Sequence, residues 1–251
     1  MDETKIWYTV SQPQFFPLLY LLERFARVDV LVFLEESQYT RKTAQSWTVL
    51  PGPNGPFRFN LPVHGGRKPT NTITLAEDPN KWFSRASKTL QLTYGKFEAF
   101  RELRDELDDI LHRVSNSKSL NDAGWITMKW LINQAGLATR VIRSRKLVPE
   151  RPVEATEWMA SFANHINATD YIQGHAAMKS YFQRGPFENR GVRLWYQEYS
   201  TPKYDQGRSD FEPVVSALDP LLRGGSDLLQ HLIQAGLPVG ESGTVQEWRY
   251  D

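Results

Sequence analysis

The segment of the sequence best suited to binding chemistry is residues 11–17, SQPQFFP, which follow an apolar run at residues 6–10. The apolar run predicts a strand, and Pro13 and Pro17 fix the backbone of the turn that follows it. Ligands of open α/β sheets gather where such strands end, so a Gln12 amide on this rigid turn can hold a substrate at little entropic cost. The alternative is that Gln12 only caps the turn while the two phenylalanines fill the core.

The best candidate for a general base is His175, which directly follows Gly174 after a short predicted strand at residues 169–172. An imidazole at this position can take a proton from an amine or a hydroxyl near neutral pH. The alternative is that His175 is a structural turn residue. His64, beside a loop that begins with Gly65 and Gly66, is a second candidate for contact with substrate.

A metal centre is not expected from the distribution of acidic residues. Glu35 and Glu36 end a predicted strand, and their side chains point to opposite faces if the strand continues. No two histidines have a metal-ligand spacing. A magnesium ion held by Asp29 or Asp219 stays open, because magnesium needs only one or two carboxylates.

The chain contains no cysteine, which excludes a thiol nucleophile, a thiolate zinc site and an iron–sulfur cluster. It also contains no Gly-x-Ser-x-Gly motif, and no glycine-rich phosphate loop follows a predicted strand. These features argue against a serine hydrolase, nucleotide hydrolysis and dinucleotide redox chemistry. We therefore expect no cofactor.

The charge of the chain is balanced, with 30 basic and 29 acidic residues and a formal net charge of +1. This balance argues against nucleic acid or an anionic membrane as partner and favours a small molecule. No run of about 18 apolar residues is present, and the N-terminus is too short and acidic for a signal peptide. A cytoplasmic location is the expectation.

The elements that must position these residues follow an α/β pattern. A strand at residues 6–10, an amphipathic helix with leucines and Phe25 on one face, and a buried strand at residues 30–34 predict a parallel β-α-β unit. Residues 46–50 and 57–63 flank a Pro-Gly-rich turn and predict an antiparallel hairpin, with a third short strand at residues 72–75.

The second half of the chain is mostly helical in pattern. Apolar residues recur every three or four positions between Phe97 and Val114, and Ser119 is a predicted N-cap. Further predicted elements are strands at residues 141–142 and 192–196 and helices at residues 158–166 and 227–235. We expect one α/β domain over residues 1–240, with a mixed sheet, flanking helices and the small hairpin, followed by a polar C-terminal tail at residues 241–251.

Taken in order along residues 8–225, these motifs resemble those of the WbqC-like family. The family's Gln-Pro-x-Phe-Phe-Pro opening is complete at residues 12–17, and its Tyr-Ile-Ser-Gly motif corresponds to residues 171–174, YIQG. The other matches are Asp29, Gln38, Tyr39, Arg41, Lys42, Trp47, Trp82, Tyr94, Tyr181, Phe187, Tyr204, Gln206 and residues 211–219. The resemblance implies a bacterial protein from O-antigen, exopolysaccharide or natural-product biosynthesis.

The sequence also departs from the family pattern. The second strand ends in Glu35 and Glu36 instead of paired aspartates, Ala86 replaces a histidine, and Arg223 replaces an asparagine. The closing Ser-Ile-Ile-Asp is residues 216–219, SALD. These departures indicate a shifted substrate or mechanism if the replaced groups do chemistry in other members.

The family resemblance and the missing redox, nucleotide and thiol machinery favour an acyl- or aminoacyl-type transferase. It would form an amide or ester on an amine-bearing sugar or an amino-acid-derived intermediate, and a carrier protein presenting an acyl thioester is a further expected partner. His175 or Asp29 is the expected base, and Arg41 with Lys42 would meet a phosphate of the donor. The expected substrate-binding residues are Gln12, Gln38, Tyr39, Arg41, Lys42, Tyr171, Tyr204, Gln206 and Asp219.

This hypothesis requires that Gln12, Gly174 and the Tyr204–Gln206 segment converge on one cavity. Two other functions stay open. One is a non-catalytic component of a biosynthetic assembly that binds the substrate or the carrier protein. The other is an isomerase or hydrolase acting on the same substrates, which would turn over without any donor.

Overall fold

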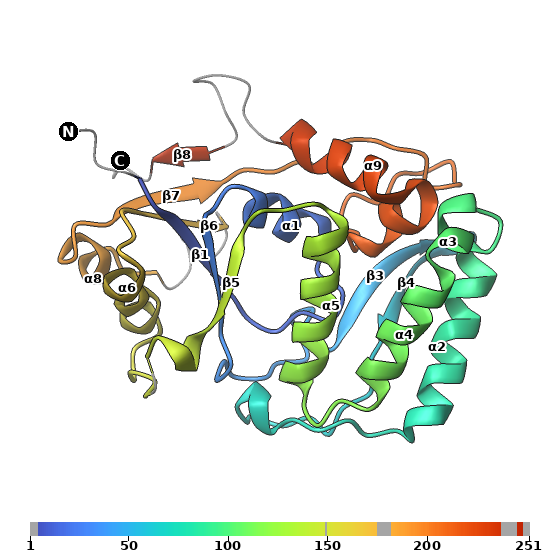
Figure 1. The fold of residues 1–251 in the computed structure, drawn as a ribbon, viewed down its shortest axis with the longest axis horizontal. Helices are drawn as coiled ribbons and strands as arrows, with labels where there is room; N and C mark the ends of the chain where they lie inside the picture. The colour runs from blue at the N-terminus through green and yellow to red at the C-terminus, as the bar shows by residue number, and fades with distance from the viewer. Residues whose placement is uncertain (1–4, 149, 175–181, 237–244, 248–251) are drawn as a thin grey trace.

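The computed structural model describes residues 5–148, 150–174, 182–236 and 245–247. Its centre is a six-stranded sheet in the order β5 (Arg140–Arg143), β2 (Val30–Phe33), β1 (Trp7–Ser11), β6 (Asp170–Gly174), β7 (Arg193–Gln197) and β8 (Val245–Glu247). The first five strands are parallel, and β8 pairs antiparallel with β7 (Figure 1). The predicted mixed sheet with a parallel β-α-β start is confirmed.

Strands are added to the sheet on both sides of β1, and the order of strands reverses there. From β1 the chain adds β2 and then β5 on one side, and later adds β6 and β7 on the other side. The connections that leave β1 and β6 therefore diverge at the carboxyl ends of neighbouring strands. This is the position where open α/β sheets leave a crevice for ligands.

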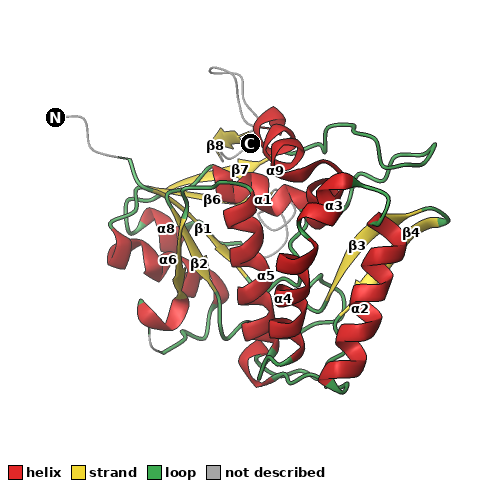
Figure 2. Ribbon diagram, turned by 45° about the vertical axis from the view of Figure 1, so that its right-hand side comes forward, coloured by secondary structure: helices red, strands yellow, loops and turns green. Residues whose placement is uncertain are grey.

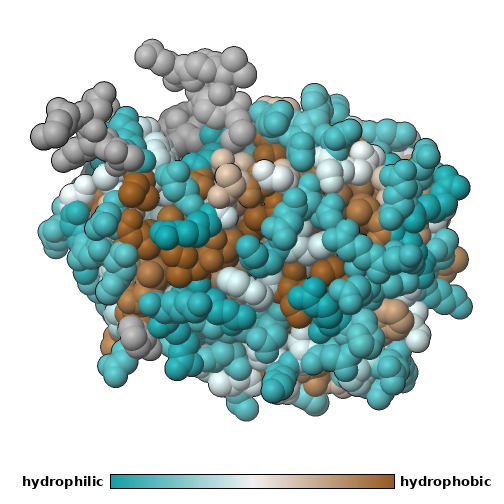
Figure 3. Space-filling model, viewed as in Figure 1, coloured by the Kyte–Doolittle hydropathy of each residue, from teal (hydrophilic) through white to brown (hydrophobic). Residues whose placement is uncertain are grey.

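Helices cover both faces of the sheet (Figure 2). On one face lie α1 (Leu19–Ala26), α5 (Leu120–Gln134) and α9 (Leu218–Gly236), extended by α2 (Pro79–Tyr94), α3 (Glu98–Glu102) and α4 (Arg104–Ser115). On the other face lie α6 (Ala155–Ile166) and α8 (Gly185–Glu188). On the side of the molecule shown in Figure 3, polar residues cover most of the surface and hydrophobic residues gather over the sheet.

Alternating side chains of β2 divide the interior into two hydrophobic clusters. Leu31 and Phe33 face the larger cluster with α1 and α5, whereas Val30 and Val32 face the smaller cluster with α6. Because both faces are covered, all four residues are buried and the strand reads as a continuous apolar run in the sequence.

The predicted hairpin is present as a separate two-stranded sheet of β3 (Trp47–Gly52) and β4 (Gly55–Asn60). The predicted third strand at residues 72–75 is wrong. Residues Thr70–Thr72 form a short 3-10 helix, and Leu75 makes only an isolated bridge with Val63. The other backbone hydrogen bonds of this segment go to different parts of the fold, because the Thr70 N–H donates to the Ser37 carbonyl and the Ile73 carbonyl accepts from the N–H of Leu120 at the start of α5.

The helical predictions hold in type but not always in extent. Ser119 caps α5 by accepting a hydrogen bond from the Asp122 N–H at 3.2 Å, as predicted. The apolar stripe after Phe97 is divided between α3 and α4. The final helix begins at Leu218 instead of residue 227 and is kinked at Gly224 and Gly225. Three residues of the predicted polar tail form β8.

Candidate functional site

The carboxyl ends of β1, β6 and β7 surround a cavity of about 500 Å³, which we call the strand-end cavity. Its walls come from the turn after β1, from one side of α1 and from the last residues of β6 and β7. The polar residues that line it are Ser11, Gln12, Gln14, Tyr20, Arg24, Thr43, Gln173, Gln197 and Tyr199. Its position is the one predicted from the strand that precedes Gln12.

The turn after β1 is held in a strained conformation. Phe16 has a φ of 46°, in the left-handed region that a phenylalanine rarely adopts, at a cost on the order of 1–3 kcal/mol. Its N–H donates to Thr127 Oγ1 at 3.1 Å, and its carbonyl accepts from Thr48 Oγ1 at 2.8 Å and Ser216 Oγ at 3.0 Å. These three hydrogen bonds fix the turn that presents the two glutamines to the cavity.

Gln12 and Gln14 each bring an amide to the cavity with hydrogen-bonding capacity left over. Gln12 Oε1 accepts from Gln45 Nε2 at 2.8 Å, while Gln12 Nε2 donates to no group in the part of the chain that the structure describes. Gln14 Oε1 is buried and likewise accepts no hydrogen bond from the described residues. A bound ligand can therefore meet one donor and one acceptor whose positions are set in advance.

Helix α1 contributes a buried cation. Arg24 is 6% exposed, lines the cavity, and donates from Nη1 to Gln173 Oε1 at 2.5 Å. The same Gln173 oxygen accepts from the Gly174 N–H at 3.0 Å. A Cβ on Gly174 would lie 3.1 Å from Arg24 Nη1, so the glycine allows the guanidinium to pack against the end of β6.

A buried ion pair supports the neighbouring wall. Glu23 is fully buried and accepts hydrogen bonds from Arg27 and from Gln197 Nε2, and Gln197 lines the cavity. Burial raises the pKa of Glu23, against the opposing effect of the Arg27 guanidinium. Burial and the nearby Glu23 carboxylate also raise the pKa of Tyr199, so its phenol stays protonated and can donate a hydrogen bond to a ligand.

Tyr171 positions other groups and does not reach the cavity. The predicted binding role is wrong because its ring is fully buried, packed against Tyr8 and Phe187. Its hydroxyl accepts from Gln173 Nε2 at 2.9 Å and donates to the Met159 sulfur at 3.4 Å. The residue fixes the rotamer of Gln173, which in turn holds Arg24.

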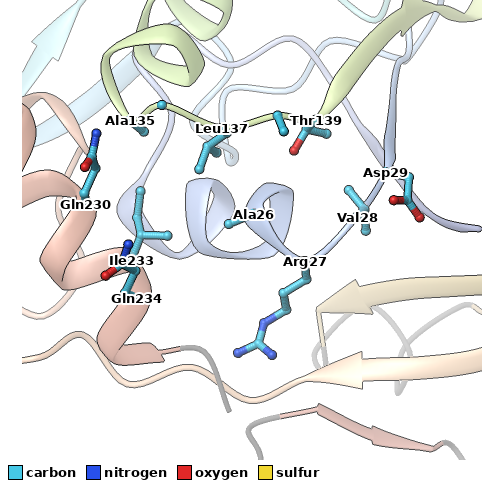
Figure 4. Close-up of a pocket in the computed structure, with 12 residues that line it drawn as sticks. Ala26, Arg27, Val28, Asp29, Ala135, Leu137, Thr139, Gln230, Ile233 and Gln234 are labelled. Atoms are coloured by element: carbon cyan, nitrogen blue, oxygen red, sulfur yellow. The ribbon is translucent and has the colours of Figure 1, made fainter. Parts of the chain in front are cut away.

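Asp29 lies at the other end of the sheet. It precedes β2, its Oδ2 accepts the Trp7 N–H at 2.8 Å, and it lines a different cavity of about 500 Å³ with Arg27, Gln230 and Gln234 (Figure 4). The length of β1 separates it from Gln12, on the order of 15 Å. Asp29 and Gln12 therefore do not share a cavity, and Asp29 cannot act as base on a substrate held by Gln12. Asp29 ties the start of β1 to β2.

Asp219 and Tyr204, two of the predicted binding residues, form hydrogen bonds with other groups of the protein. Asp219 is fully buried and accepts from the Tyr94 hydroxyl at 2.7 Å, the Tyr204 hydroxyl at 2.6 Å and Arg223 Nε at 2.8 Å. Burial raises the pKa of Asp219, and the Arg223 charge and the two phenols oppose that shift. We call these four residues the closed cluster, because Asp219 has no exposed surface left for a ligand.

Gln206 belongs to a loop contact beside that cluster. Its Nε2 donates to the Glu212 carbonyl and its Oε1 accepts the Glu212 N–H, both at 2.8 Å. Both ends of the amide are therefore occupied. Gln206 lines a small cavity of about 180 Å³ with Arg223 and not the strand-end cavity. The expected convergence thus holds for Gln12 and Gly174 and fails for the Tyr204–Gln206 segment.

Gln38, Tyr39, Arg41 and Lys42 come together as predicted, but around another hollow. They line a cavity of about 550 Å³ with Thr40, Gly65, Gly66 and Arg67, which we call the basic cavity. The ring of Tyr39 is buried and its hydroxyl lies 3.0 Å from Ser46 Oγ. His175 lies outside the described residues, and its role as base stays a prediction.

The sequence analysis missed Arg24, Gln173 and Tyr199. A signal for Arg24 was present: α1 is apolar on most sides, so a charged residue inside it has to be buried with a partner. Gln173 was part of a recognised motif, and only the strand pairing of β6 shows that it faces α1. Nothing in the sequence marks Tyr199.

Fold and site together define an α/β protein with a polar cavity at the carboxyl ends of parallel strands, where the order of strands reverses. No helix in the described ranges is both long and apolar enough to cross a membrane. Within those ranges, no three acidic or histidine side chains are grouped as metal ligands.

Comparison with known proteins gives the family. The sequence pattern of the WbqC-like protein family matches residues 12–231, and the chain belongs to this family. A curated relative is the uncharacterized protein Rv1507c of Mycobacterium tuberculosis, which is 24% identical over 227 residues. That alignment covers 89% of this chain and 96% of the relative. The family match includes β2, β5, β6 and β7, the hairpin of β3 and β4, and every residue that lines the basic cavity. Of the residues that line the strand-end cavity, it leaves out only Val10 and Ser11.

Proposed function

We propose that the protein is an acyl- or aminoacyl-type transferase that binds its acceptor in the strand-end cavity. The acceptor is an amine-bearing sugar or an amino-acid-derived intermediate with an anionic group, in surface-polysaccharide or natural-product biosynthesis. The observation that carries the proposal is the lining of this cavity. It combines the buried cation of Arg24 with amides of Gln12 and Gln14 that have unused hydrogen-bonding capacity.

The lining suits such an acceptor for physical reasons. A guanidinium pairs with a carboxylate or phosphate, and the amides and the Tyr199 phenol form directed hydrogen bonds with hydroxyls and amines. Because the turn that carries Gln12 is fixed by its contacts with Thr127 and Thr48, little conformational entropy is lost on binding.

The reaction needs few protein groups when the donor is a thioester. The acceptor nitrogen attacks the thioester carbonyl, the C–N bond forms, the C–S bond breaks, and the thiolate leaves. His175 is proposed to remove the proton of the attacking amine and return it to the thiolate, and Gln12 Nε2 to donate to the carbonyl oxygen as it gains charge. The chain holds no cysteine, so a thiol cannot carry the acyl group as an intermediate, and direct transfer between donor and acceptor is the simplest route.

A second candidate function is a non-catalytic acceptor-binding component of a biosynthetic assembly. One observation favours it: within the described residues, no histidine, aspartate or glutamate lines the strand-end cavity. Under this alternative the cavity binds the same acceptor, but His175 has no part in turnover because no turnover occurs.

The experiment incubates purified protein with a panel of amine-bearing sugars and amino acids together with acyl and aminoacyl thioesters, and measures the mass of each acceptor. We expect a mass gain on at least one acceptor, its loss in Gln12→Leu and His175→Gln, and its retention in Asp29→Asn. Binding of an acceptor without any mass gain would favour the non-catalytic component. Conversion of an acceptor without donor would favour an isomerase or hydrolase, and equal loss in Asp29→Asn would contradict the site.

A further inference from the structure

The basic cavity differs from the strand-end cavity in charge. Three of its lining residues are cations, Arg41, Lys42 and Arg67, and no carboxylate lines it. Among the described residues, none of these three side chains forms an ion pair, although eleven ion pairs join other basic residues of the protein to carboxylates. Three like charges therefore share one hollow without a compensating protein group, which favours an anionic ligand.

The backbone of the Gly65–Gly66 loop adds hydrogen-bond donors to this charge. The N–H groups of Gly65, Gly66 and Arg67 donate to no acceptor in the described part of the chain. Backbone N–H groups without a protein acceptor can donate hydrogen bonds to an anion bound in the cavity. Gly66 has a φ of 151°, which only glycine adopts without strain, so this loop conformation requires a glycine at residue 66.

Gly65 also sets the position of Arg41. A Cβ on Gly65 would lie 3.2 Å from the Nε and Nη2 atoms of Arg41 and 3.2 Å from the Tyr39 ring. The guanidinium thus packs against the loop because residue 65 has no side chain. The Arg41 carbonyl is held as well, since it accepts a hydrogen bond from Trp47 Nε1 at 3.3 Å.

One buried glutamine joins the two cavities. Gln45 is fully buried; its Nε2 donates to Gln12 Oε1 at 2.8 Å and to the Gln38 carbonyl at 3.3 Å, and its Oε1 accepts the Thr40 N–H at 2.8 Å. Gln12 lines the strand-end cavity, whereas Gln38 and Thr40 line the basic cavity. The two hollows therefore lie on either side of the segment that Gln45 organises.

We infer that the basic cavity binds a phosphate group of the acyl donor, with the reactive end of the donor directed toward the strand-end cavity. The inference rests on the proposed transferase function and names its donor class, a thioester on a phosphorylated pantetheine arm. This arm occurs in two forms, as free coenzyme A and as phosphopantetheine on a carrier protein. Both carry an anionic phosphate group that Arg41, Lys42 and Arg67 can meet, as a pyrophosphate and a 3′-phosphate in coenzyme A and as a single phosphodiester on the carrier protein.

The test measures binding without turnover, by calorimetric titration of the full-length protein with coenzyme A, with pantetheine lacking phosphate, and with a carrier protein with and without its phosphopantetheine arm. We expect coenzyme A or the armed carrier protein to bind and pantetheine to bind far more weakly. The triple variant Arg41→Gln, Lys42→Gln, Arg67→Gln should lose on the order of tenfold or more in affinity. Preference for the armed carrier protein over coenzyme A assigns the donor to the carrier form.

Two variants keep the test sharp. The matched control Lys81→Gln, Lys88→Gln, Lys203→Gln removes the same charge from exposed lysines elsewhere and should bind within about twofold of the wild type. Gly65→Ala keeps every charge but displaces Arg41, and should weaken phosphate binding by a few fold. Equal losses in the control triple variant, equal binding of coenzyme A and pantetheine, or no binding of any phosphate probe would overturn the inference.

The outcome is separable from the transferase proposal. Phosphate-dependent binding together with a negative transfer assay would retain the basic cavity as a phosphate site and remove the reaction. A positive transfer assay that is unaffected by the Arg41, Lys42 and Arg67 triple variant would retain the reaction and remove the phosphate site.

Discussion

The molecule contains two polar clusters that each include a nearly buried arginine side chain, and of the two only the closed cluster contains a carboxylate. In the closed cluster, Asp219 is met by Arg223, Tyr94 and Tyr204, and the carboxylate has no exposed surface. Around the strand-end cavity, Arg24 is also nearly buried, but it lies beside amides that still have a free donor and a free acceptor.

We propose that the two clusters have different roles: the closed cluster stabilises the fold, whereas Arg24 and the neighbouring amides bind a ligand. In the closed cluster both carboxylate oxygens of Asp219 accept hydrogen bonds, and Arg223 donates from Nε to Asp219 and from Nη2 to the Pro51 carbonyl. Asp219 is fully buried, so it offers a ligand no accessible acceptor. At the strand ends the protein leaves Gln12 Nε2 and Gln14 Oε1 for a ligand to satisfy. Stability should therefore depend on the first cluster and binding on the second.

The largest expected effect is on stability, in the variant Asp219→Ala. Removing the carboxylate leaves the Arg223 guanidinium, only 6% exposed, without its charge partner, at a cost of about 3–5 kcal/mol in the free energy of unfolding. The measurement is urea unfolding. The double variant Asp219→Ala, Arg223→Met should recover part of the loss, because it also removes the stranded charge. A loss below about 1 kcal/mol in the single variant would contradict the claim that the closed cluster stabilises the fold.

An intermediate effect is expected from Glu23, which supports the wall of the strand-end cavity. Its pKa is raised by burial above 4.5, so its contribution to stability is complete below the unfolded pKa and is lost as the pH rises through the folded pKa. In Glu23→Gln this loss is absent. The free energy of unfolding of the variant should therefore increase relative to that of the wild type as the pH rises above about 4.5. The difference between the two should change by at most about 1.4 kcal/mol per pH unit.

The Glu23 measurement compares unfolding free energies of the two proteins at several values between about pH 4.5 and pH 8. Taking the difference cancels the contribution of Asp219, whose pKa is shifted in the same direction. If the two unfolding free energies change in parallel with pH, or if the variant becomes relatively less stable at high pH, then the Arg27 ion pair outweighs the effect of burial on the Glu23 pKa.

The variant Gly174→Ala should have the smallest effect on stability. It should nevertheless have a measurable effect on binding. The new Cβ would press on Arg24 Nη1, which must move by a few tenths of an ångström. We expect acceptor affinity to fall by a few fold while the free energy of unfolding changes by less than about 1 kcal/mol. Gly185→Ala is the control, because a Cβ there meets no atom within 4 Å. Unchanged affinity in Gly174→Ala would separate Arg24 from the binding site.

The sequence was sufficient to predict most of the local elements and a cavity at the strand ends. The apolar runs around α1 predict the parallel start, and the turn containing Gln12 predicts a cavity at the strand ends. It could not predict which far-separated polar residues meet. The Tyr94 hydroxyl reaches Asp219 across 125 residues of sequence, and a tyrosine that fills such a cluster looks the same in the sequence as one that contacts a ligand. The sequence also did not show that Asp29 and Gln12 lie at opposite ends of the sheet, because a loop residue before one strand looks the same in the sequence as a loop residue after another.

The central claim is that the strand-end cavity, and not the cavity beside Asp29, holds the acceptor. The most direct measurement is a crystal structure of the protein soaked with the acceptor panel of amine-bearing sugars and amino acids. The account predicts ligand density in contact with Gln12, Arg24 and Gly174, and none of it in Arg24→Gln crystals. Density beside Asp29 and Gln234, with the strand-end cavity holding only water, would contradict it.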